Sequence, residues 1–174
     1  SSVPNFITLT LIDWVDLFIR PAYFKILDDA LNYCIKQKGI EINAYVYMSS
    51  HIHLILKSEE IPIGTFVTLF KKFTTTELIR AIQEIPESRK EWLLNKFGFA
   101  ASRIKRGKNF KIWKDGFHPV ILDTPIKIEQ RINYIHNNPF ESQLVREPRE
   151  WVNSSCMEYE NDKAKSNVRI VRLF

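Results

Sequence analysis

Hydrophobic and polar residues alternate early in the chain in a way that predicts β-strands. Residues 6–11 place threonines between aliphatic side chains, which is the period-two pattern of a half-buried strand. Residues 40–48 are rich in β-branched and aromatic side chains, and a second such run follows over residues 51–57. Because only Ser49 and Ser50 separate these two runs, the pattern predicts a hairpin.

Longer segments repeat their apolar residues at three- and four-residue spacing, as a helix with one buried face does. Gly39 suits the C-terminal cap of the first such helix. Thr124 and Pro125 begin the last one, because threonine can cap a helix and proline is tolerated at its first position. We expect this helix to end near Asn138, since Pro139 disfavours helical geometry in the residue before it. The predicted helices cover residues 21–38, 63–82, 88–104 and 124–138.

The remaining segments have shorter strand patterns. Residues 110–113 and 117–122 flank a Lys-Asp-Gly turn and predict a second hairpin. A charged segment over residues 158–165 precedes a predicted terminal strand over residues 168–174. The chain has no internal repeat and no domain-sized linker. We therefore expect residues 1–174 to form one α+β domain, with a central antiparallel sheet flanked by helices.

Length and composition narrow the class of protein. The 174 residues are 45% hydrophobic, which is ordinary for a globular chain. The chain contains no run of eighteen apolar residues, which is the length needed to span a membrane. The first residues show no basic and apolar leader of the secretory type. Two lone cysteines, Cys34 and Cys156, argue against a disulfide framework and against a cysteine-rich zinc site. We expect a cytoplasmic protein.

Positive charge gathers in one segment of this chain, whose net charge is +5. Residues 103–114 hold six cations and no acidic residue, with two aromatic rings among them. Cations that neutralise phosphates and rings that stack on bases are together typical of single-strand binders, whereas a solvated basic loop is the alternative. The predicted DNA-binding residues are Lys71, Lys72, Arg103, Lys105, Arg106, Lys108, Lys111, Trp113 and Lys114.

His51 and His53 lie two residues apart in a predicted strand. Both imidazoles therefore leave the same face of the sheet, with their roots about 7 Å apart. Two imidazoles in this arrangement can bind one metal ion. The alternative is a pair of polar residues on a solvated sheet face.

Tyr134 and Asn138 lie four residues apart at the end of a predicted helix, so they share one face. Tyr134 could present a phenol, and Asn138 an amide oxygen, to the same neighbour. The alternative is a partly buried aromatic ring followed by a C-terminal cap.

These patterns together resemble one family, the single-tyrosine DNA transposases of the HUH class. In that motif two histidines flank a bulky apolar residue, here Ile52. Further segments resemble the REP-associated branch: its tryptophan-containing segment, its tyrosine helix ending in Asn-Pro, and its Trp-x-x-Ser-Ser motif. The matching segments are residues 41–56, 112–117, 134–139 and 151–155. They follow the family's order over about residues 6–155, which leaves residues 156–174 as a C-terminal tail.

The resemblance implies a ferredoxin-like sheet with a defined active site. It assigns His51 and His53 as ligands of Mg²⁺ or Mn²⁺ and Tyr134 as the nucleophile. Asn138 falls where insertion-sequence relatives have a glutamine as third ligand, and the REP-associated branch also has asparagine there. The family often has Pro-Asn directly before the first histidine, whereas this chain has Ser49-Ser50. That difference affects the turn and not the ligands.

The implied reaction is cleavage of single-stranded, hairpin-forming DNA. A free tyrosine phenol has a pKa of about 10, so its attack at neutral pH needs help from a metal that polarises the phosphate. The products would be a 5′-phosphotyrosine and a free 3′-hydroxyl, which allows rejoining without ATP. The family includes monomers and homodimers, and it implies a bacterial, nucleoid-associated protein. The alternatives are an inactive single-strand binding module and a metal-dependent nuclease that uses water.

Overall fold

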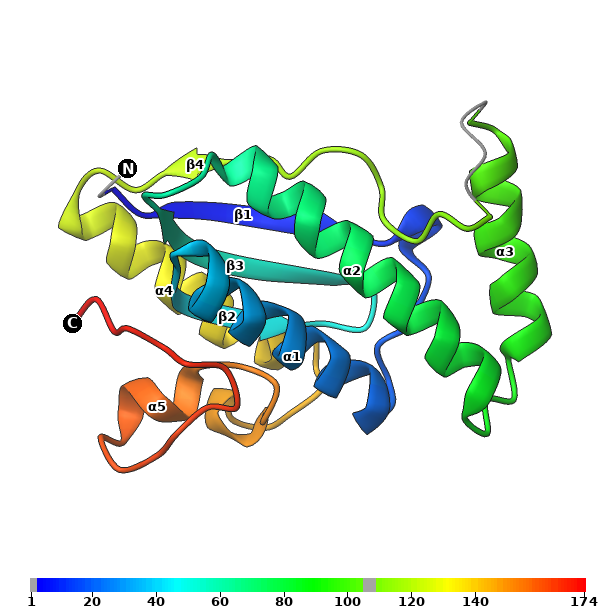
Figure 1. The fold of residues 1–174 in the computed structure, drawn as a ribbon. Helices are drawn as coiled ribbons and strands as arrows, with labels where there is room; N and C mark the ends of the chain where they lie inside the picture. Colours follow the sequence, from blue (N-terminus) through cyan, green and yellow to red (C-terminus); the bar gives the residue numbers. More distant parts are fainter. Residues whose placement is uncertain (1–2, 105–108) are drawn as a thin grey trace.

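The computed structural model describes residues 3–104 and 109–174, which form an antiparallel sheet with helices on both faces (Figure 1). Its strands are β1 (Asn5–Thr10), β2 (Ile40–Tyr47), β3 (His51–Ser58) and β4 (Val120–Ile121). Its α-helices are α1 (Pro21–Lys38), α2 (Ile63–Glu84), α3 (Lys90–Ser102), α4 (Pro125–Glu141) and α5 (Cys156–Glu160). Two 3-10 turns are η1 (Ile12–Trp14) and η2 (Pro148–Glu150). No helix in the described residues is both long and apolar enough to cross a membrane.

The strands follow the order β2-β3-β1-β4, so β3 and β1 lie at the centre of the sheet. The predicted hairpin of β2 and β3 is confirmed, with the N–H of Met48 donating to the carbonyl of His51 across the turn at 2.8 Å. In the register of β1 against β3, Thr8 lies opposite His53 and Thr10 lies opposite His51. This pairing puts two hydroxyls beside the two imidazoles.

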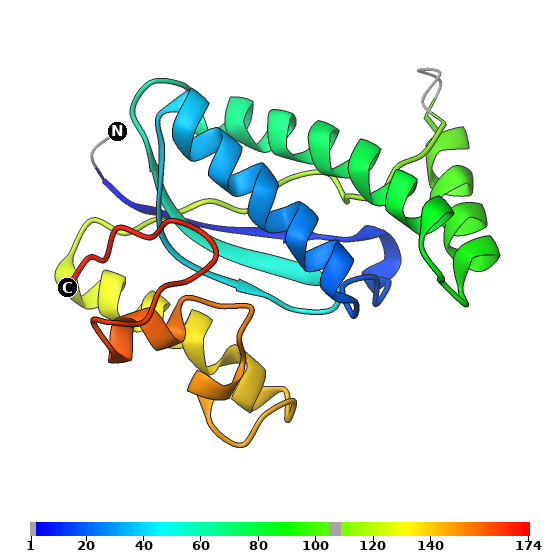
Figure 2. The ribbon, with the colours of Figure 1, turned by 60° about the horizontal axis from the view of Figure 1, so that its bottom comes forward.

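Alternation along β3 decides which side chains face which layer. Helices α1 and α2 cover one face of the sheet and α4 covers the other, as the two views of Figures 1 and 2 show. Ile52 and Leu54 belong to the larger core cluster, beneath α1 and α2. Ile55 packs in the smaller cluster with Ile132 and Ile135 of α4. His51 and His53 therefore point to the face that α4 partly covers, as the strand pattern predicts.

The predicted helix starts and caps are confirmed at two positions. Gly39 ends α1 in the left-handed conformation, at φ 65°, where a residue with a Cβ would be strained. The Thr124 hydroxyl accepts the N–H of Lys127 at 3.3 Å at the start of α4.

The predicted end of α4 near Asn138 is wrong, because the helix continues to Glu141 with Pro139 inside it. A proline there removes only the hydrogen bond that its N–H would have donated to the carbonyl of Ile135. The following turn stays closed, since the N–H of Ser142 donates to the carbonyl of Asn138 at 3.0 Å. Pro139 itself is buried.

The second predicted hairpin is also wrong. Residues 112–122 do not fold back on themselves but run antiparallel along the free edge of β1. The N–H of Lys114 donates to the carbonyl of Thr10, the N–H of Thr8 donates to the carbonyl of Phe117, and β4 pairs with the start of β1. Residues 168–174, predicted as a strand, form a single parallel bridge to β2 at Ile170.

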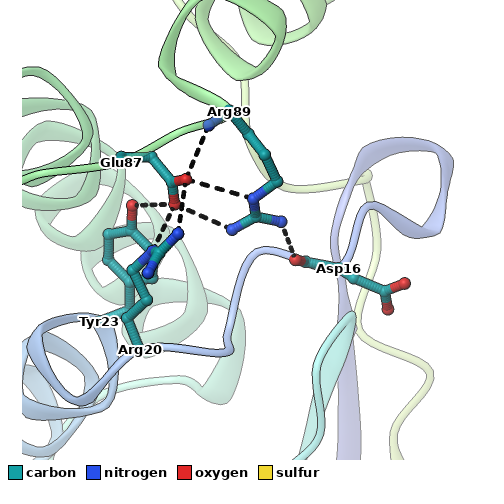
Figure 3. Close-up of polar contacts among 5 residues, drawn as sticks. All are labelled: Asp16, Arg20, Tyr23, Glu87 and Arg89. Atoms are coloured by element: carbon teal, nitrogen blue, oxygen red, sulfur yellow. Dashed lines mark hydrogen bonds and ion pairs between the residues drawn. The ribbon is translucent and has the colours of Figure 1, made fainter.

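A buried carboxylate, Glu87, ties the corner between α2 and α3 to the start of α1. Its side chain is fully buried and accepts hydrogen bonds from the guanidinium groups of Arg20 and Arg89 and from the hydroxyl of Tyr23, each at about 2.9–3.0 Å. Arg89 also donates to the carbonyl of Asp16. Figure 3 shows the two arginines approaching the carboxylate from different sides. These contacts hold the segment between η1 and α1 in place.

We expect Glu87→Gln to destabilise the fold by about 2–3 kcal/mol. Removing one partner of a fully buried pair costs about 3–5 kcal/mol, and the partial exposure of both arginines lowers that value. Hydrogen bonds from Arg20, above all, lower the pKa of Glu87. The stabilisation is therefore complete above the ordinary carboxyl pKa and is lost as pH falls through the lower folded-state value. Urea unfolding at neutral and acid pH measures both effects, and the variant should lose less stability on acidification.

The matched control is Glu77→Gln on α2, where Glu77 forms an exposed pair with Arg80 at 2.9 Å. Such surface pairs contribute about 0–1 kcal/mol. Equal losses in the two variants would show that the Glu87 cluster contributes no more than a surface pair.

Candidate active site

An open cleft of about 500 Å³ lies where the sheet meets the end of α4. Strands β1 and β3, the turn η1, helix α4 and the segment of residues 114–118 each contribute to its wall. The lining residues are Thr8, Thr10, Trp14, His51, His53, Lys114, Asp115, Gly116, His118, Tyr134 and Asn138. The structure thus brings the predicted nucleophile and all three predicted metal ligands into one cleft.

The two imidazoles lie side by side, with ring centroids 4.9 Å apart. Each Nδ1 atom has a hydroxyl neighbour: Thr8 Oγ1 lies 2.9 Å from Nδ1 of His53, and Ser50 Oγ lies 3.2 Å from Nδ1 of His51. When Nδ1 carries the proton, it donates to the hydroxyl. The lone pair of Nε2 is then free to bind a metal ion. Metal-binding histidines are commonly oriented by a hydrogen bond at the other nitrogen.

Burial keeps both imidazoles neutral. Desolvation, above all, lowers the pKa of His53 to about 3, with smaller contributions in the same direction from His51 and Arg131. Desolvation also lowers the pKa of His51. A neutral imidazole is the form that binds a metal ion.

Tyr134 extends from α4 into the cleft. Ile132 and Ile135 of the same helix are buried against the sheet, whereas the Tyr134 side chain is 47% exposed. Its ring lies edge-on to His53 with centroids 5.4 Å apart, and the guanidinium of Arg131 lies 5.8 Å from its centroid. The phenol therefore stands beside the histidine pair while remaining open to solvent.

Asn138 lies one helical turn after Tyr134 and lines the same cleft. In the part of the chain that the structure describes, no group of three His, Cys, Asp or Glu side chains could hold a metal ion. A metal on this site therefore needs a donor of another type beside His51 and His53. Two imidazole nitrogens with an amide oxygen are a mixed donor set that suits magnesium, manganese or zinc.

Across β1 from the histidines, the cleft is lined by a loop over residues 114–118. Lys71 holds it by donating from Nζ to the carbonyls of Lys114 and Gly116 at 2.8 and 2.9 Å. Burial lowers the pKa of Lys71. Gly116 and His118 both have positive φ, 91° and 46°, and a non-glycine residue in that region is strained. Lys71 thus shapes the cleft through backbone contacts, while the Lys114 side chain is exposed at the cleft.

The prediction that Trp113 contacts DNA is wrong. Its ring is only 3% exposed and packs against Phe18 and Phe70 in the core. Its Nε1 donates to the hydroxyl of Thr74 at 2.9 Å. A buried ring cannot stack on a base, and the short segment around Trp113 has too little periodicity to show which way the ring points.

The other predicted cations are spread over the surface. Lys72 is exposed on α2, and the guanidinium of Arg103 lies over the ring of Phe99, 5.5 Å from its centroid. Lys111 pairs with Asp115 at 2.8 Å. Lys105, Arg106 and Lys108 lie outside the described residues.

Several residues of the cleft were not singled out from the sequence. Thr8, Thr10 and Ser50 stand beside the histidines, and Trp14 contacts His51 edge-on with ring centroids 5.6 Å apart. The alternation that predicts β1 puts both threonines on one face. However, only the register of β1 against β3 shows that this face is the histidine face.

No protein-family model and no curated protein matches this sequence. Solved structures do match. One is a REP-associated tyrosine transposase bound to a REP hairpin, with a TM-score of 0.65 and 17% identity over 99% of this chain and 87% of that chain. Another is a candidate transposase from Deinococcus radiodurans R1, with a TM-score of 0.46 and 16% identity over 79% of this chain and 92% of that chain.

The α+β architecture is therefore a tyrosine-transposase fold. More particularly, nearly the whole chain superimposes on the REP-associated tyrosine transposase. At this level of identity the likeness concerns the fold, and the chemistry depends on the residues of the cleft itself.

Proposed function

We propose that this protein is a transposase that cuts and rejoins single-stranded DNA with Tyr134 as its nucleophile. The main support is the meeting, in one open cleft, of an exposed phenol and two neutral imidazoles that lie 81 and 83 residues away in the chain. A phenol beside a histidine pair provides a nucleophile and a phosphate-activating site together.

The chemistry follows from where each group lies. The Tyr134 oxygen attacks the phosphorus in line with the leaving 3′-oxygen, which departs with a proton as a free 3′-hydroxyl. One phosphoester bond forms as the other breaks, so a second 3′-hydroxyl can reverse the step without ATP. Helix α4 positions Tyr134, because Ile132 and Ile135 fix its face against the sheet. Lys114, which also lines the cleft, can neutralise a phosphate oxygen.

His51, His53 and Asn138 are the residues that would hold a divalent ion, and we propose Mg²⁺ or Mn²⁺. Such an ion, when bound, polarises the scissile phosphate and offsets its negative charge. The hydroxyls of Thr8 and Ser50 orient the two imidazoles through their Nδ1 atoms. The amide oxygen of Asn138 suits Mg²⁺ or Mn²⁺, and the two imidazoles suit a transition-metal ion at the same site.

The substrate is proposed to be hairpin-forming DNA with a single-stranded flank. The matched transposase is described as bound to a REP hairpin. The cleft is open and lined by Lys114 and by the exposed ring of Trp14, and such groups suit an unpaired strand. Lys72, Arg103 and Lys111 remain proposed phosphate contacts, as do the three cations outside the described residues.

Incubation with a labelled hairpin oligonucleotide and Mn²⁺, followed by a denaturing gel, tests the proposal. A transposase leaves a covalent protein–DNA band that protease removes. Cleavage without such a band would indicate a nuclease that uses water, and binding without cleavage would indicate a DNA-binding module. Either of those two results would overturn the proposed function.

A further inference from the structure

Helix α3 lies at the end of the molecule beyond the sheet (Figure 1). It carries an exposed stripe of aromatic and basic side chains. Its buried side is formed by Leu93, Phe97 and Ala101. On the other side, Trp92 is 55% exposed and Phe99 is 65% exposed. These two rings are seven residues apart, so they lie on one face of the helix. Exposed apolar side chains that gather in one patch commonly mark an interaction site.

Two cations share this face. Lys96 and Arg103 stand four residues after Trp92 and Phe99 respectively, so rings and charges alternate along the stripe. The guanidinium of Arg103 lies over the Phe99 ring, and among the described residues it forms no ion pair. Lys96 pairs with Asp13 of η1 at 3.0 Å. We call Trp92, Lys96, Phe99 and Arg103 the α3 face.

The α3 face adjoins the cleft through η1. A hollow of about 240 Å³ lies between η1 and α3, and Asp13, Phe99 and Arg103 contribute to its wall. The next residue, Trp14, lines the cleft and is 60% exposed. One dipeptide therefore contacts both spaces. The ion pair of Lys111 with Asp115 joins the same two spaces on the other side, since Lys111 lines the hollow and Asp115 lines the cleft.

The backbone of η1 is strained at Asp13 and Trp14. Asp13 and Trp14 have φ values of 51° and 55°, which non-glycine residues rarely adopt. Such strain persists where the surrounding structure imposes it, and it is concentrated at functional sites. Here the pair of Asp13 with Lys96 and the contact of Trp14 with His51 fix the turn from both sides.

We propose that Trp14 and the α3 face form a track for single-stranded DNA, along which the strand leaves the cleft. The proposal rests on the proposed function, because it takes the strand to be DNA held in the cleft. Rings that stack on unpaired bases, alternating with cations that contact phosphates, are the chemistry of single-strand binding. An apolar protein partner would not call for the Arg103 guanidinium over the Phe99 ring.

Fluorescence anisotropy with oligothymidylates of increasing length tests the track. The wild type should gain affinity with length beyond the point at which the cleft is filled. In Trp92→Ala/Phe99→Ala the gain should stop at a shorter length, with the longest oligonucleotide bound about tenfold more weakly for each ring lost. The matched control is Tyr33→Ala/Phe73→Ala, which removes two stacked rings, 55% and 44% exposed, from α1 and α2. It should follow the wild type.

A second measurement does not depend on affinity. Photo-crosslinking with 5-iodouracil placed along the oligonucleotide should label the peptides that contain Trp14 and Phe99. Superimposed length curves for the wild type and the Trp92/Phe99 variant, or crosslinks confined to other peptides, would overturn the track. A dimer seen by light scattering that the Trp92/Phe99 variant abolishes would also overturn it, since the α3 face would then be a protein interface.

The two proposals fail separately. A covalent adduct with no effect of oligonucleotide length would leave the transposase standing without the track. Length-dependent binding that needs Trp92 and Phe99, with no adduct, would leave the track standing on a DNA-binding protein.

Discussion

Tyr134→Phe should abolish strand cleavage and the covalent protein–DNA band while leaving DNA binding and folding unchanged. The change removes one oxygen and keeps the ring that contacts His53 and Phe6. Loss of a covalent nucleophile lowers turnover by about a millionfold, so cleavage should fall to background. The side chain is about half exposed, so removal of its hydroxyl leaves no buried partner unsatisfied.

The matched control for this variant is Tyr33→Phe. Tyr33 is 55% exposed on α1, close to the exposure of Tyr134, and lies on the other side of the sheet from the cleft. Tyr47 and Tyr159 are poorer controls, because their hydroxyls donate to Asp28 and to the carbonyl of Asn43. Mass spectrometry of the wild-type adduct should place the DNA on the peptide that contains Tyr134. An adduct on another tyrosine would end the proposed mechanism while the fold remained valid.

Replacing both His51 and His53 with Gln should lower the rate of metal-dependent cleavage at least about a hundredfold. That is the usual effect of losing a group that stabilises charge in the transition state. Binding of Mn²⁺ in the absence of DNA, measured by calorimetry, should be lost as well. Glutamine keeps much of the buried volume beside Phe6, so the variant should fold. DNA affinity should change little, because phosphate contacts lie elsewhere.

His118→Ala is the informative comparison for the histidine pair. His118 lines the same cleft but is exposed on the 114–118 loop. It should bind Mn²⁺ as the wild type does. Loss of metal binding in His118→Ala, with binding retained in the double variant, would show that the metal site is misassigned.

Patterns with a clear period predict much of this fold. The hairpin of β2 and β3 and the helices α1 and α2 follow from alternation and from three- and four-residue spacing, which report directly on a buried face. The shared face of His51 and His53 follows from the same argument. That they lie beside Tyr134 is predicted only by the family resemblance, since no local pattern links residues that are 81 positions apart.

The parts that could not be predicted depend on long-range contacts. Residues 112–122 have a strand-like pattern, but their partner is the free edge of β1 and not each other. Trp92 has the apolar character of a core residue and is nevertheless exposed, whereas Trp113 sits in a basic segment and is buried. The position of α3 decides the exposure of Trp92, and the position of β1 decides the burial of Trp113. Neither position is encoded nearby in the chain.

The construction of the cleft from distant segments has a consequence for the order in which the protein is made. Contacts such as Thr8 with His53 and His53 with Tyr134 have large sequence separations, and such contacts form late because long loops must close first. Because synthesis runs from the N-terminus, both histidines are made well before α4. The growing chain therefore holds His51 and His53 without Tyr134 and Asn138, so the proposed DNA cutting would be available only to a finished, folded molecule.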